Sequence, residues 1–345
     1  MPKLTCNHLW KIFGKAPEKT LAALTASQHP STSEGSKQQI ADHVIAVRDV
    51  SFEVNAGETF VVMGLSGSGK STLIRCLSRL AEPTAGEIIV DGQDIRKMSE
   101  SQLRELRRHK ISMVFQNFGL LPHRCVLDNV AYGLEVCGVG KAQRHERAAQ
   151  MIELVGLKGW EQHYPKQLSG GMQQRVGLAR ALAVDPEIML FDEPFSALDP
   201  LIRREMQDEL LRLQATLHKT SVFITHDFAE ALKLGDRIAI MKEGRFVQLG
   251  TPQELVLHPK DDYVRAFVKD APRAKVLTAA TIMSPCPVAY SPNGRTATPE
   301  TCLDDLMPML ADSDAPVAIM RNGQAAGIVD RAIVIRALIQ ETPDP

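Results

Sequence analysis

The stretch GLSGSGKS, Gly64 to Ser71, fits the pattern G-x-x-x-x-G-K-[ST] at every defined position. A β-rich run, ETFVVM, precedes it and a helical pattern follows it, which is the context that this motif requires. Glycines let several backbone N–H groups converge on phosphate oxygens, and the start of the following helix adds positive potential. The stretch therefore predicts a phosphate-binding loop between a strand and a helix.

The residue types within this loop suit a nucleotide held together with Mg²⁺. Lys70 can reach the β- and γ-phosphates, and the Ser71 hydroxyl can bind Mg²⁺. Further contacts to the nucleotide are expected from the remaining positions, which are Gly64, Leu65, Ser66, Gly67, Ser68, Gly69 and Thr72.

A pair of carboxylates follows a second strand. The apolar run IMLF, residues 188–191, predicts a buried strand, and Asp192 and Glu193 come at its C-terminal end. Ligands bind at this end of the strands in open α/β sheets. We therefore expect Asp192 to hold the Mg²⁺ shell and Glu193 to polarise a water molecule as a general base.

Three lone polar residues gain meaning from their positions. Gln116 follows the strand pattern ISMVF and His226 follows SVFIT, so both are expected at strand ends that face the phosphate loop. Gln116 would contact Mg²⁺ or the attacking water, and His226 would hydrogen-bond the γ-phosphate. Asp199 in SALD precedes Pro200 and a helical pattern, so we expect it to cap that helix, to face the nucleotide, or to do both.

The stretch LSGGMQQR, Leu168 to Arg175, opens a helical pattern that runs on to Val184. A helix that starts with a serine and two glycines presents bare backbone N–H groups and is a ready-made anion site. The phosphate loop lies far earlier in the sequence, so this helix raises the question of which anion Ser169, Gly170 and Gly171 face.

Strands alternate with helices along the chain, which predicts a parallel α/β core. Residues from about 117 to 183 are mostly helical and read as an arm inserted into that core. The stretch 15–43 has two helix-like runs, EKTLAALTA and KQQIADH, around a polar breaker, and we interpret it as an insertion. The letters KEG at 242–244 predict a hairpin turn, and a break at KDAPRAKV, 269–276, precedes a last small β–α segment.

Composition excludes several classes of protein. The chain has 345 residues, enough for two domains, and its 40 basic and 41 acidic residues argue against a nucleic-acid partner. It has no apolar run long enough to span a bilayer, and the N-terminus lacks the apolar core of a signal peptide. The six cysteines show no CxxC spacing and the ten histidines no HxxxH pair, which favours reduced thiols and no protein-held transition metal.

The chain carries six motifs in order: the phosphate loop, Gln116 after a strand, LSGG, a strand that ends in Asp192 and Glu193, SALD, and His226. This order resembles the ATPase subunit of ABC transporters. The resemblance covers roughly residues 4–270. It implies an α/β P-loop NTPase fold of the ABC ATPase type, with a parallel-sheet core, an antiparallel β subdomain and an inserted helical subdomain at about 117–183. We expect an ABC ATPase domain at 1–270, with the insertion at about 15–43.

The resemblance also answers the question of the second anion. It implies that LSGG faces ATP across a homodimer interface, so the anion is the γ-phosphate of a nucleotide held by the partner's Lys70. Ser169 and Gly171 would supply these contacts in trans, and Gly170 would allow close approach. Family members stack the adenine on an aromatic residue after the first strand, where Phe13 fits and Trp10 is the alternative; a core role for Phe13 stays open.

A narrower resemblance rests on MGLSGSGKST, ISMVFQNFGLLPH, FSALDPLIRREMQDELLRLQ and the early insertion. These stretches look like the ATPases of bacterial glycine betaine, proline and choline importers, and histidine importers remain candidates. Members of this group often end in paired regulatory CBS motifs. Residues 276–340 resemble about one such motif, because GIVDRAIVIRAL matches its strand–helix ending, and a packing or dimerisation module is the alternative.

The resemblance implies a motor subunit that lies peripherally on the cytoplasmic face of the inner (plasma) membrane. Two copies would bind ATP and Mg²⁺, close face to face, and move transmembrane permease subunits docked on FGLLPHRCVLDNV, residues 118–130. An extracytoplasmic substrate-binding protein would deliver the substrate.

Two other functions share parts of these motifs. A non-transport ABC ATPase of DNA repair or translation would carry long coiled coils or two cassettes, and this chain shows neither pattern. A regulatory nucleotide-binding module with little catalysis is disfavoured by the intact Glu193.

Overall fold

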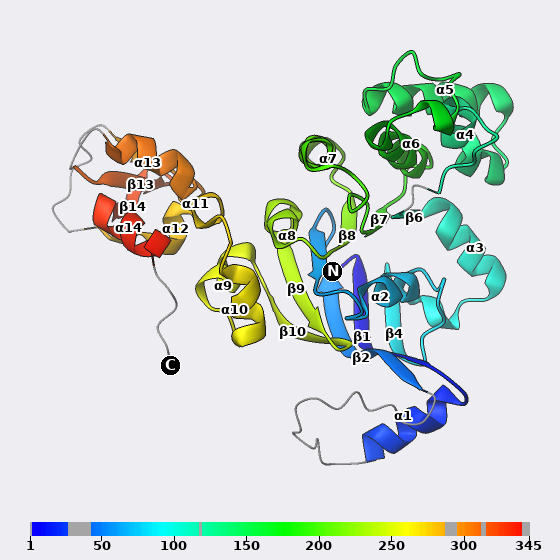
Figure 1. Cartoon of the computed structure of the whole chain (residues 1–345), viewed down its shortest axis with the longest axis horizontal. Helices are drawn as coiled ribbons and strands as arrows, with labels where there is room; N and C mark the ends of the chain where they lie inside the picture. The colour runs from blue at the N-terminus through cyan, green and yellow to red at the C-terminus, as the bar shows by residue number, and fades with distance from the viewer. Residues whose placement is uncertain (1, 27–42, 117–118, 287–294, 312–314, 340–345) are drawn as a thin grey trace. The chain divides into compact units, whose positions relative to one another are not determined.

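The computed structural model describes residues 2–26, 43–116, 119–286, 295–311 and 315–339 (Figure 1). The chain falls into two compact units. The first comprises the residues up to Glu230 together with Ala239–Val247, and the second comprises Ala231–Ile238 and the chain from Gln248 onward.

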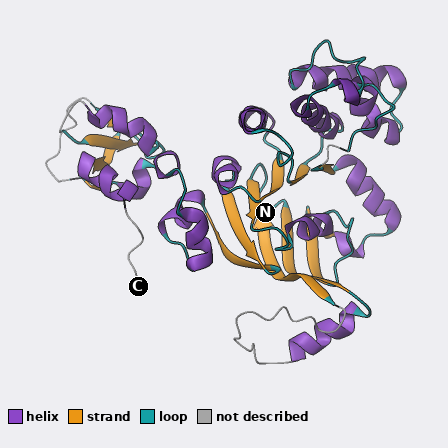
Figure 2. Ribbon diagram, in the orientation of Figure 1, coloured by secondary structure: helices purple, strands orange, loops and turns teal. Residues whose placement is uncertain are grey.

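A six-stranded sheet forms the centre of the first unit (Figure 2). Its strand order is β10-β9-β3-β8-β7-β6. The pairs β3–β8, β8–β7 and β7–β6 are parallel, as predicted. The bounds are β3 (Thr59–Met63), β6 (Ile111–Val114), β7 (Ile188–Asp192), β8 (Thr220–Thr225), β9 (Arg237–Lys242) and β10 (Arg245–Gly250).

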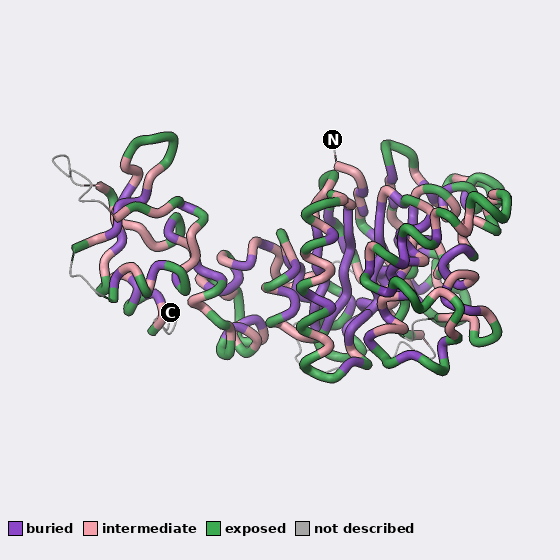
Figure 3. The backbone as a smooth tube through the Cα atoms, turned by 90° about the horizontal axis from the view of Figure 1, so that it is seen from above, coloured by how far each residue is buried: buried purple, intermediate pink, exposed green. Residues whose placement is uncertain are grey.

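Burial follows the position of each strand in this sheet. Every residue of β3, β7 and β8 is buried, as near-continuous apolar runs in a parallel sheet require (Figure 3). The strand β6 is only half-buried, with its first and last residues buried and the two between them partly exposed. It lies at the edge of the sheet, so only one neighbouring strand covers it.

A second, antiparallel sheet has the order β2-β1-β4-β5, with β1 (Leu4–Phe13), β2 (Val44–Val54), β4 (Ala85–Val90) and β5 (Gln93–Asp94). The helix α2 (Lys70–Leu77) starts at the phosphate loop and contacts strands of both sheets. The ring of Phe52 in β2 stacks on that of Phe60 in β3 with centroids 4.7 Å apart. This sheet is the predicted antiparallel β subdomain.

The inserted arm is a separate group of helices in Figure 1. It contains α4 (Val126–Val136), α5 (Lys141–Leu154), the 3₁₀ turn η2 (Pro165–Gln167) and α6 (Gly170–Ala183), and the three α-helices contact one another pairwise. The arm therefore matches the helical subdomain predicted between about 117 and 183.

The remaining helices of the first unit follow their sequence signals. The helix α3 (Glu100–His109) begins with a capping box between Ser99 and Gln102, and η1 (Ile95–Lys97) precedes it. The helix α7 (Pro200–Leu217) follows β7, and α8 (Phe228–Leu234), which begins in the first unit and continues into the second, follows β8. The insertion contributes α1 (Pro17–Ala26), while the predicted helical run KQQIADH lies almost wholly outside the described residues.

The second unit carries its own small sheet, β11-β14-β13-β12, with β11 (Ser284–Pro285), β12 (Thr296–Ala297), β13 (Val317–Arg321) and β14 (Gln324–Val329). Its helices are α9 (Pro252–Leu257), α10 (Asp262–Val268), α11 (Arg273–Val276), α12 (Ala279–Ile282), α13 (Leu303–Ala311) and α14 (Arg331–Ile339). The strand β14 followed by α14 is the ending that GIVDRAIVIRAL predicts. Among the described residues, no helix combines the length and hydropathy needed to cross a membrane.

Candidate active site

Glycine is required at two positions of the phosphate loop by its neighbours. Gly64 and Gly69 have φ angles of +155° and +106°. A Cβ on Gly64 would collide with the carbonyl oxygen of Met241, and one on Gly69 with that of Ala46. The backbone of β9 and of β2 therefore approaches the loop so closely that no side chain fits.

The hairpin turn between β9 and β10 braces the same loop. Glu243 and Gly244 both have positive φ, as a two-residue turn of type I′ requires. The Gly244 amide donates to the carbonyl oxygen of Ser68 at 2.9 Å, and the Arg48 amide donates to that of Gly244 at 2.8 Å. The turn predicted from KEG is confirmed, but its contact with the phosphate loop has no signal in the sequence.

Lys70, the first residue of α2, is buried at the loop. Its Nζ donates to the carbonyl oxygens of Gly64 and Leu65 at 2.8 and 3.1 Å, and it lies 3.7 Å from Oε1 of Glu193. Burial lowers the pKa of Lys70, and the carboxylates of Glu193 and Asp192 oppose that shift. The structure thus brings the predicted phosphate-binding lysine and the predicted base together.

Asp192 ends β7 with its side chain almost fully buried. Its Oδ2 lies 3.4 Å from Nη2 of Arg75, whereas Oδ1 is buried and has no hydrogen-bond partner among the residues that the structure describes. A buried carboxylate oxygen without a donor is costly, so it suits a cation as an additional partner. The oxygen donors of Asp192 and of Ser71 at the start of α2 fit Mg²⁺ by their chemistry.

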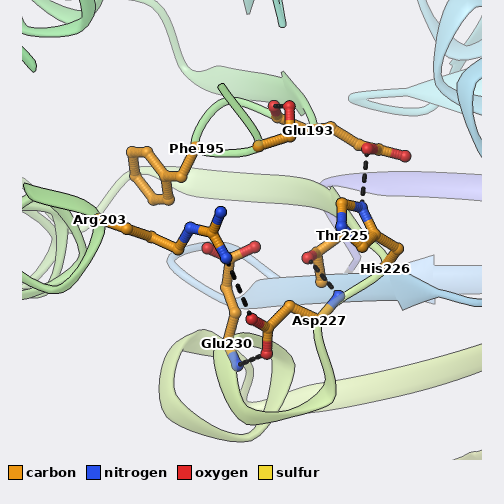
Figure 4. A pocket seen from close by; sticks show the side chains of 8 residues that line it. Glu193, Phe195, Arg203, Thr225, His226, Asp227 and Glu230 are labelled. Atoms are coloured by element: carbon orange, nitrogen blue, oxygen red, sulfur yellow. Dashed lines mark hydrogen bonds and ion pairs between the residues drawn. The ribbon is translucent and has the colours of Figure 1, made fainter. Parts of the chain in front are cut away.

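Glu193 and His226 face each other across neighbouring strand ends (Figure 4). His226 Nδ1 lies 2.9 Å from Oε2 of Glu193. Glu193 has a left-handed backbone, with φ of +46°, which is unusual for a residue other than glycine and marks local strain. Its side chain is 17% exposed and that of His226 is 51% exposed, so the pair is open to a ligand from solvent.

Gln116 shows no contact with the predicted Mg²⁺ ligands Asp192 and Ser71 in the part of the chain that the structure describes. It follows the edge strand β6 and is exposed. Within the described ranges, no hydrogen bond connects its side chain to Asp192 or Ser71. The strand-end position predicted for Gln116 is confirmed, and its contact with Mg²⁺ or water stays a prediction.

The LSGG motif, residues 168–171, opens α6. Ser169 caps the helix, because its hydroxyl accepts a hydrogen bond from the Met172 amide at 3.3 Å. Ser169 and Gly170 are exposed, whereas Gly171 is buried. A Cβ on Gly171 would come within 2.5 Å of Cγ2 of Ile202 in α7. Gly171 is therefore also required for packing within the chain, a role that the sequence did not indicate.

Asp199 caps α7 by accepting hydrogen bonds from the amides of Leu201 and Ile202 at 3.2 and 3.1 Å. The capping role predicted for Asp199 is thereby confirmed. Asp199 is exposed, and its neighbour Leu198 packs against Gly170 of the LSGG motif. A contact between Asp199 and the nucleotide stays a prediction.

Phe13 ends β1 with 46% of its surface exposed, and Lys11 Nζ lies 4.7 Å from the ring centroid. Phe13 pairs with Val44 of β2, two residues before Ala46, which abuts the phosphate loop. Trp10 is partly buried. The exposed ring at the loop end of β1–β2 disfavours a core role for Phe13, and stacking on adenine stays a prediction.

The comparisons with known proteins agree with this geometry. The family model described as ABC transporter matches residues 47–196. The trimethylamine N-oxide transport system ATP-binding protein TmoW of Ruegeria pomeroyi is 51% identical over 98% of this chain and 98% of its own. The chain belongs to the ATP-binding proteins of ABC transporters. The predicted family and the predicted enzyme class, an ATPase that drives transport, are confirmed.

Further relatives of this ATP-binding cassette carry related names. The glycine betaine transport protein OpuAA of Bacillus subtilis is 55% identical over 81% of this chain and 66% of its own length. The glycine betaine/proline betaine protein ProV of Escherichia coli is 46% identical over 98% of this chain and 83% of its own. The dimeric cassette MJ0796 bound to ADP and Pi aligns with a TM-score of 0.60 and 31% identity, covering 72% and 98%. The predicted P-loop fold is confirmed.

One residue of the cassette that sequence reasoning missed is Asn129 in α4. It is fully buried, and its amide group makes four polar contacts of hydrogen-bond length with the loop that follows β6. Oδ1 accepts from the Leu121 amide, and the two protons of Nδ2 are shared among the carbonyl oxygens of Leu121, Arg124 and Cys125. An asparagine within a helical pattern gives no local signal of this role, because its partners are loop carbonyls.

Proposed function

We propose that this chain is the ATP-hydrolysing subunit of an ABC importer for small methylated amine osmoprotectants such as glycine betaine, proline betaine or trimethylamine N-oxide. The names of relatives at 46 to 55% identity support this substrate class. Two of them align over 98% of the chain, so the similarity extends beyond the cassette motifs. An importer for histidine or another amino acid is the alternative.

The observation that carries the proposal is the cluster of Lys70, Glu193 and His226 at the end of the parallel sheet. Lys70 and the loop amides would hold the β- and γ-phosphates of ATP. Ser71, Asp192 and Gln116 would hold Mg²⁺, which supplies charge neutralisation between the phosphates when bound. The buried Oδ1 of Asp192, which has no hydrogen-bond partner in the described part of the chain, supports this assignment.

The catalytic step follows from the charges at this cluster. Glu193 would accept a proton from the water that attacks the γ-phosphate. His226, whose Nδ1 lies 2.9 Å from this carboxylate, would hydrogen-bond the γ-phosphate. Lys70, 3.7 Å from Glu193, keeps positive charge beside the phosphate as negative charge shifts toward the leaving group. Phe13 or Trp10 would stack on the adenine.

The complete site requires two copies of the chain. Ser169, Gly170 and Gly171 are remote in sequence from the phosphate loop, and in this proposal they contact ATP held by the partner, with Asp199 beside them. The exposed Ser169 at a helix start supports this anion contact. The cassette would bind permease subunits at the membrane's cytoplasmic face, and an extracytoplasmic binding protein would deliver substrate.

The proposed domain division follows the sequence break at 269–276. An ABC ATPase domain would cover residues 1–270, with the arm at about 117–183 and the insertion at about 15–43. Residues 276–340 would form a CBS-like regulatory segment. The small sheet β11-β14-β13-β12 and the strand–helix ending β14–α14 support this assignment.

The experiment that tests the proposal replaces Glu193 with Gln in the full-length chain. Without the base, the variant should bind ATP, fail to hydrolyse it and accumulate as a dimer, observed by light scattering with and without ATP. Glu205→Gln, an exposed glutamate of α7, is the matched control and should remain active without trapping a dimer. A Glu193→Gln chain that stays monomeric at saturating ATP would contradict the composite site.

A further inference from the structure

The first turn of α7 packs directly against the LSGG motif. A Cβ on Gly171 would come within 2.5 Å of Ile202, and one on Gly170 within 3.4 Å of Leu198. Leu198 and Ile202 flank Asp199, whose side chain caps α7. The contact leaves no free space at Gly171, so a displacement of LSGG is expected to move the first turn of α7 with it.

Arg203, next to Ile202, joins this turn to the loop that carries His226 (Figure 4). Its Nη2 donates to the carbonyl oxygen of Leu198 at 3.2 Å, and its Nη1 lies 3.5 Å from Oδ2 of Asp227. One guanidinium group thus contacts the segment before α7 and the segment before α8. Its planar fork can serve both partners at once, which the single ammonium of a lysine does less well.

Asp227, the partner of Arg203, precedes α8 and is held by two further hydrogen bonds. Its Oδ1 accepts a hydrogen bond from the Glu230 amide at 3.1 Å, and its own amide donates to Oγ1 of Thr225 at 3.0 Å. Both carboxylate oxygens of Asp227 are therefore engaged. His226, the preceding residue, faces Glu193 at 2.9 Å. Asp227 thus holds the backbone beside His226 and also contacts Arg203.

We propose that Arg203 is a positioning residue that couples the LSGG motif to His226 within one chain. The inference rests on the proposed function, in which LSGG contacts the nucleotide of the partner while His226 contacts the chain's own nucleotide. Under that arrangement, Arg203 lies on the path between the two ATP sites of the dimer. It makes the orientation of His226 depend on whether LSGG has engaged the other site.

The test measures ATP hydrolysis by the full-length chain as a function of ATP concentration. Arg203→Gln should lower kcat by about tenfold or more, leave KM within about twofold, and reduce a Hill coefficient above 1 toward 1. Arg203→Lys should regain part of kcat, because it retains the charge opposite Asp227. Arg204→Gln removes the same charge from the adjacent exposed position and should keep kcat within about twofold.

A double-mutant cycle with Asp227→Asn separates coupling from simple loss of stability. If both residues act on one path, the double variant should be no slower than the slower single variant, within about twofold. Melting temperatures should stay close to that of Arg204→Gln. The proposal would be overturned if the losses of the two single variants multiplied in the double variant, or if Arg203→Gln were as active as Arg204→Gln. It would equally be overturned by a wild-type Hill coefficient of 1, or by a kcat loss that follows a fall in melting temperature.

Failure of the proposed function would be visible separately. It appears in the Glu193→Gln chain, where Arg203 is intact, as absence of an ATP-dependent dimer. A trapped dimer in that variant together with an inert Arg203→Gln substitution would leave the proposed function standing and refute the coupling alone.

Discussion

Replacing Asn129 with alanine should loosen the loop that follows β6 without touching the phosphate site. The carboxamide of Asn129 contacts Leu121, Arg124 and Cys125 at four donor–acceptor distances of 2.8 to 3.1 Å, and the residue is fully buried. Alanine removes these contacts and leaves the Leu121 amide without this acceptor. The contacts of Arg180 with the Gly119 carbonyl oxygen and of Arg124 with Glu135 would remain.

The size of the effect follows from the number of bonds. The Nδ2 group has two protons shared among three carbonyl oxygens, so with the bond accepted by Oδ1 the carboxamide makes at most three full hydrogen bonds. At about 1 kcal/mol net for each bond this is about 3 kcal/mol, and water that enters the site recovers part of it, so we expect about 2 kcal/mol less stability for the loop in Asn129→Ala. That corresponds to an increase of about thirtyfold in the hydrogen-exchange rate of the Leu121 amide.

Hydrogen exchange read over residues 119–130, together with urea unfolding, measures this loss. Asn55→Ala is the matched control, because Asn55 is exposed and its side chain donates to the nearby Glu58, so its cost should stay below about 0.5 kcal/mol. Asn129→Asp should be worse than Asn129→Ala, since it directs negative charge at three carbonyl oxygens. A loss below about 1 kcal/mol, or the reverse order of the two variants, would refute the clamp.

Three further outcomes follow from single contacts. Burial raises the pKa of Glu230, so its ionisation destabilises the fold as pH rises from 4.5 through the raised value. In urea titrations, Glu230→Gln should therefore lose less stability than the unaltered chain as pH rises above 4.5. Gly171→Ala should cost about 1–3 kcal/mol in thermal melts because its Cβ meets Ile202, and adding Ile202→Ala should recover part of it, whereas an unchanged melt would contradict the packing. Lys70→Ala should abolish ATP-driven uptake in a reconstituted transporter, and uptake at the normal rate would remove the phosphate role of Lys70.

The sequence was sufficient wherever a motif and its flanking elements constrain each other locally. GLSGSGKS between an apolar run and a helical pattern predicts the loop, the strand β3 and the helix α2, all of which the structure contains. The pair Asp192–Glu193 after IMLF is correctly predicted at the end of a fully buried strand. Parallel strands place their carboxyl ends at one edge, so the approach of His226 to Glu193 also follows from the strand pattern.

The sequence was insufficient where a residue acts through a distant partner. Nothing near KEG at 242–244 indicates that Gly244 supports Ser68, because the contact depends on β9 lying beside β3 in the sheet. The same holds for Arg203, which reads as an ordinary charged helix residue until α7 and the loop after β8 are placed side by side. Strand order across a sheet is set by global packing, which local patterns do not encode.

Gly171 shows why a motif can be identified correctly and still be interpreted incompletely. Its position at a helix start favours an anion contact through the backbone, a role that needs no side chain but tolerates one wherever space is open. The structure adds a stricter requirement, because Ile202 fills the space that a Cβ would take. A loss of ATPase activity in Gly171→Ala alone would therefore not distinguish a lost phosphate contact from a displaced α7. The double variant Gly171→Ala with Ile202→Ala distinguishes these two causes. Removing the Ile202 side chain relieves the clash and restores the position of α7, so any ATPase loss that remains comes from the contact with the nucleotide.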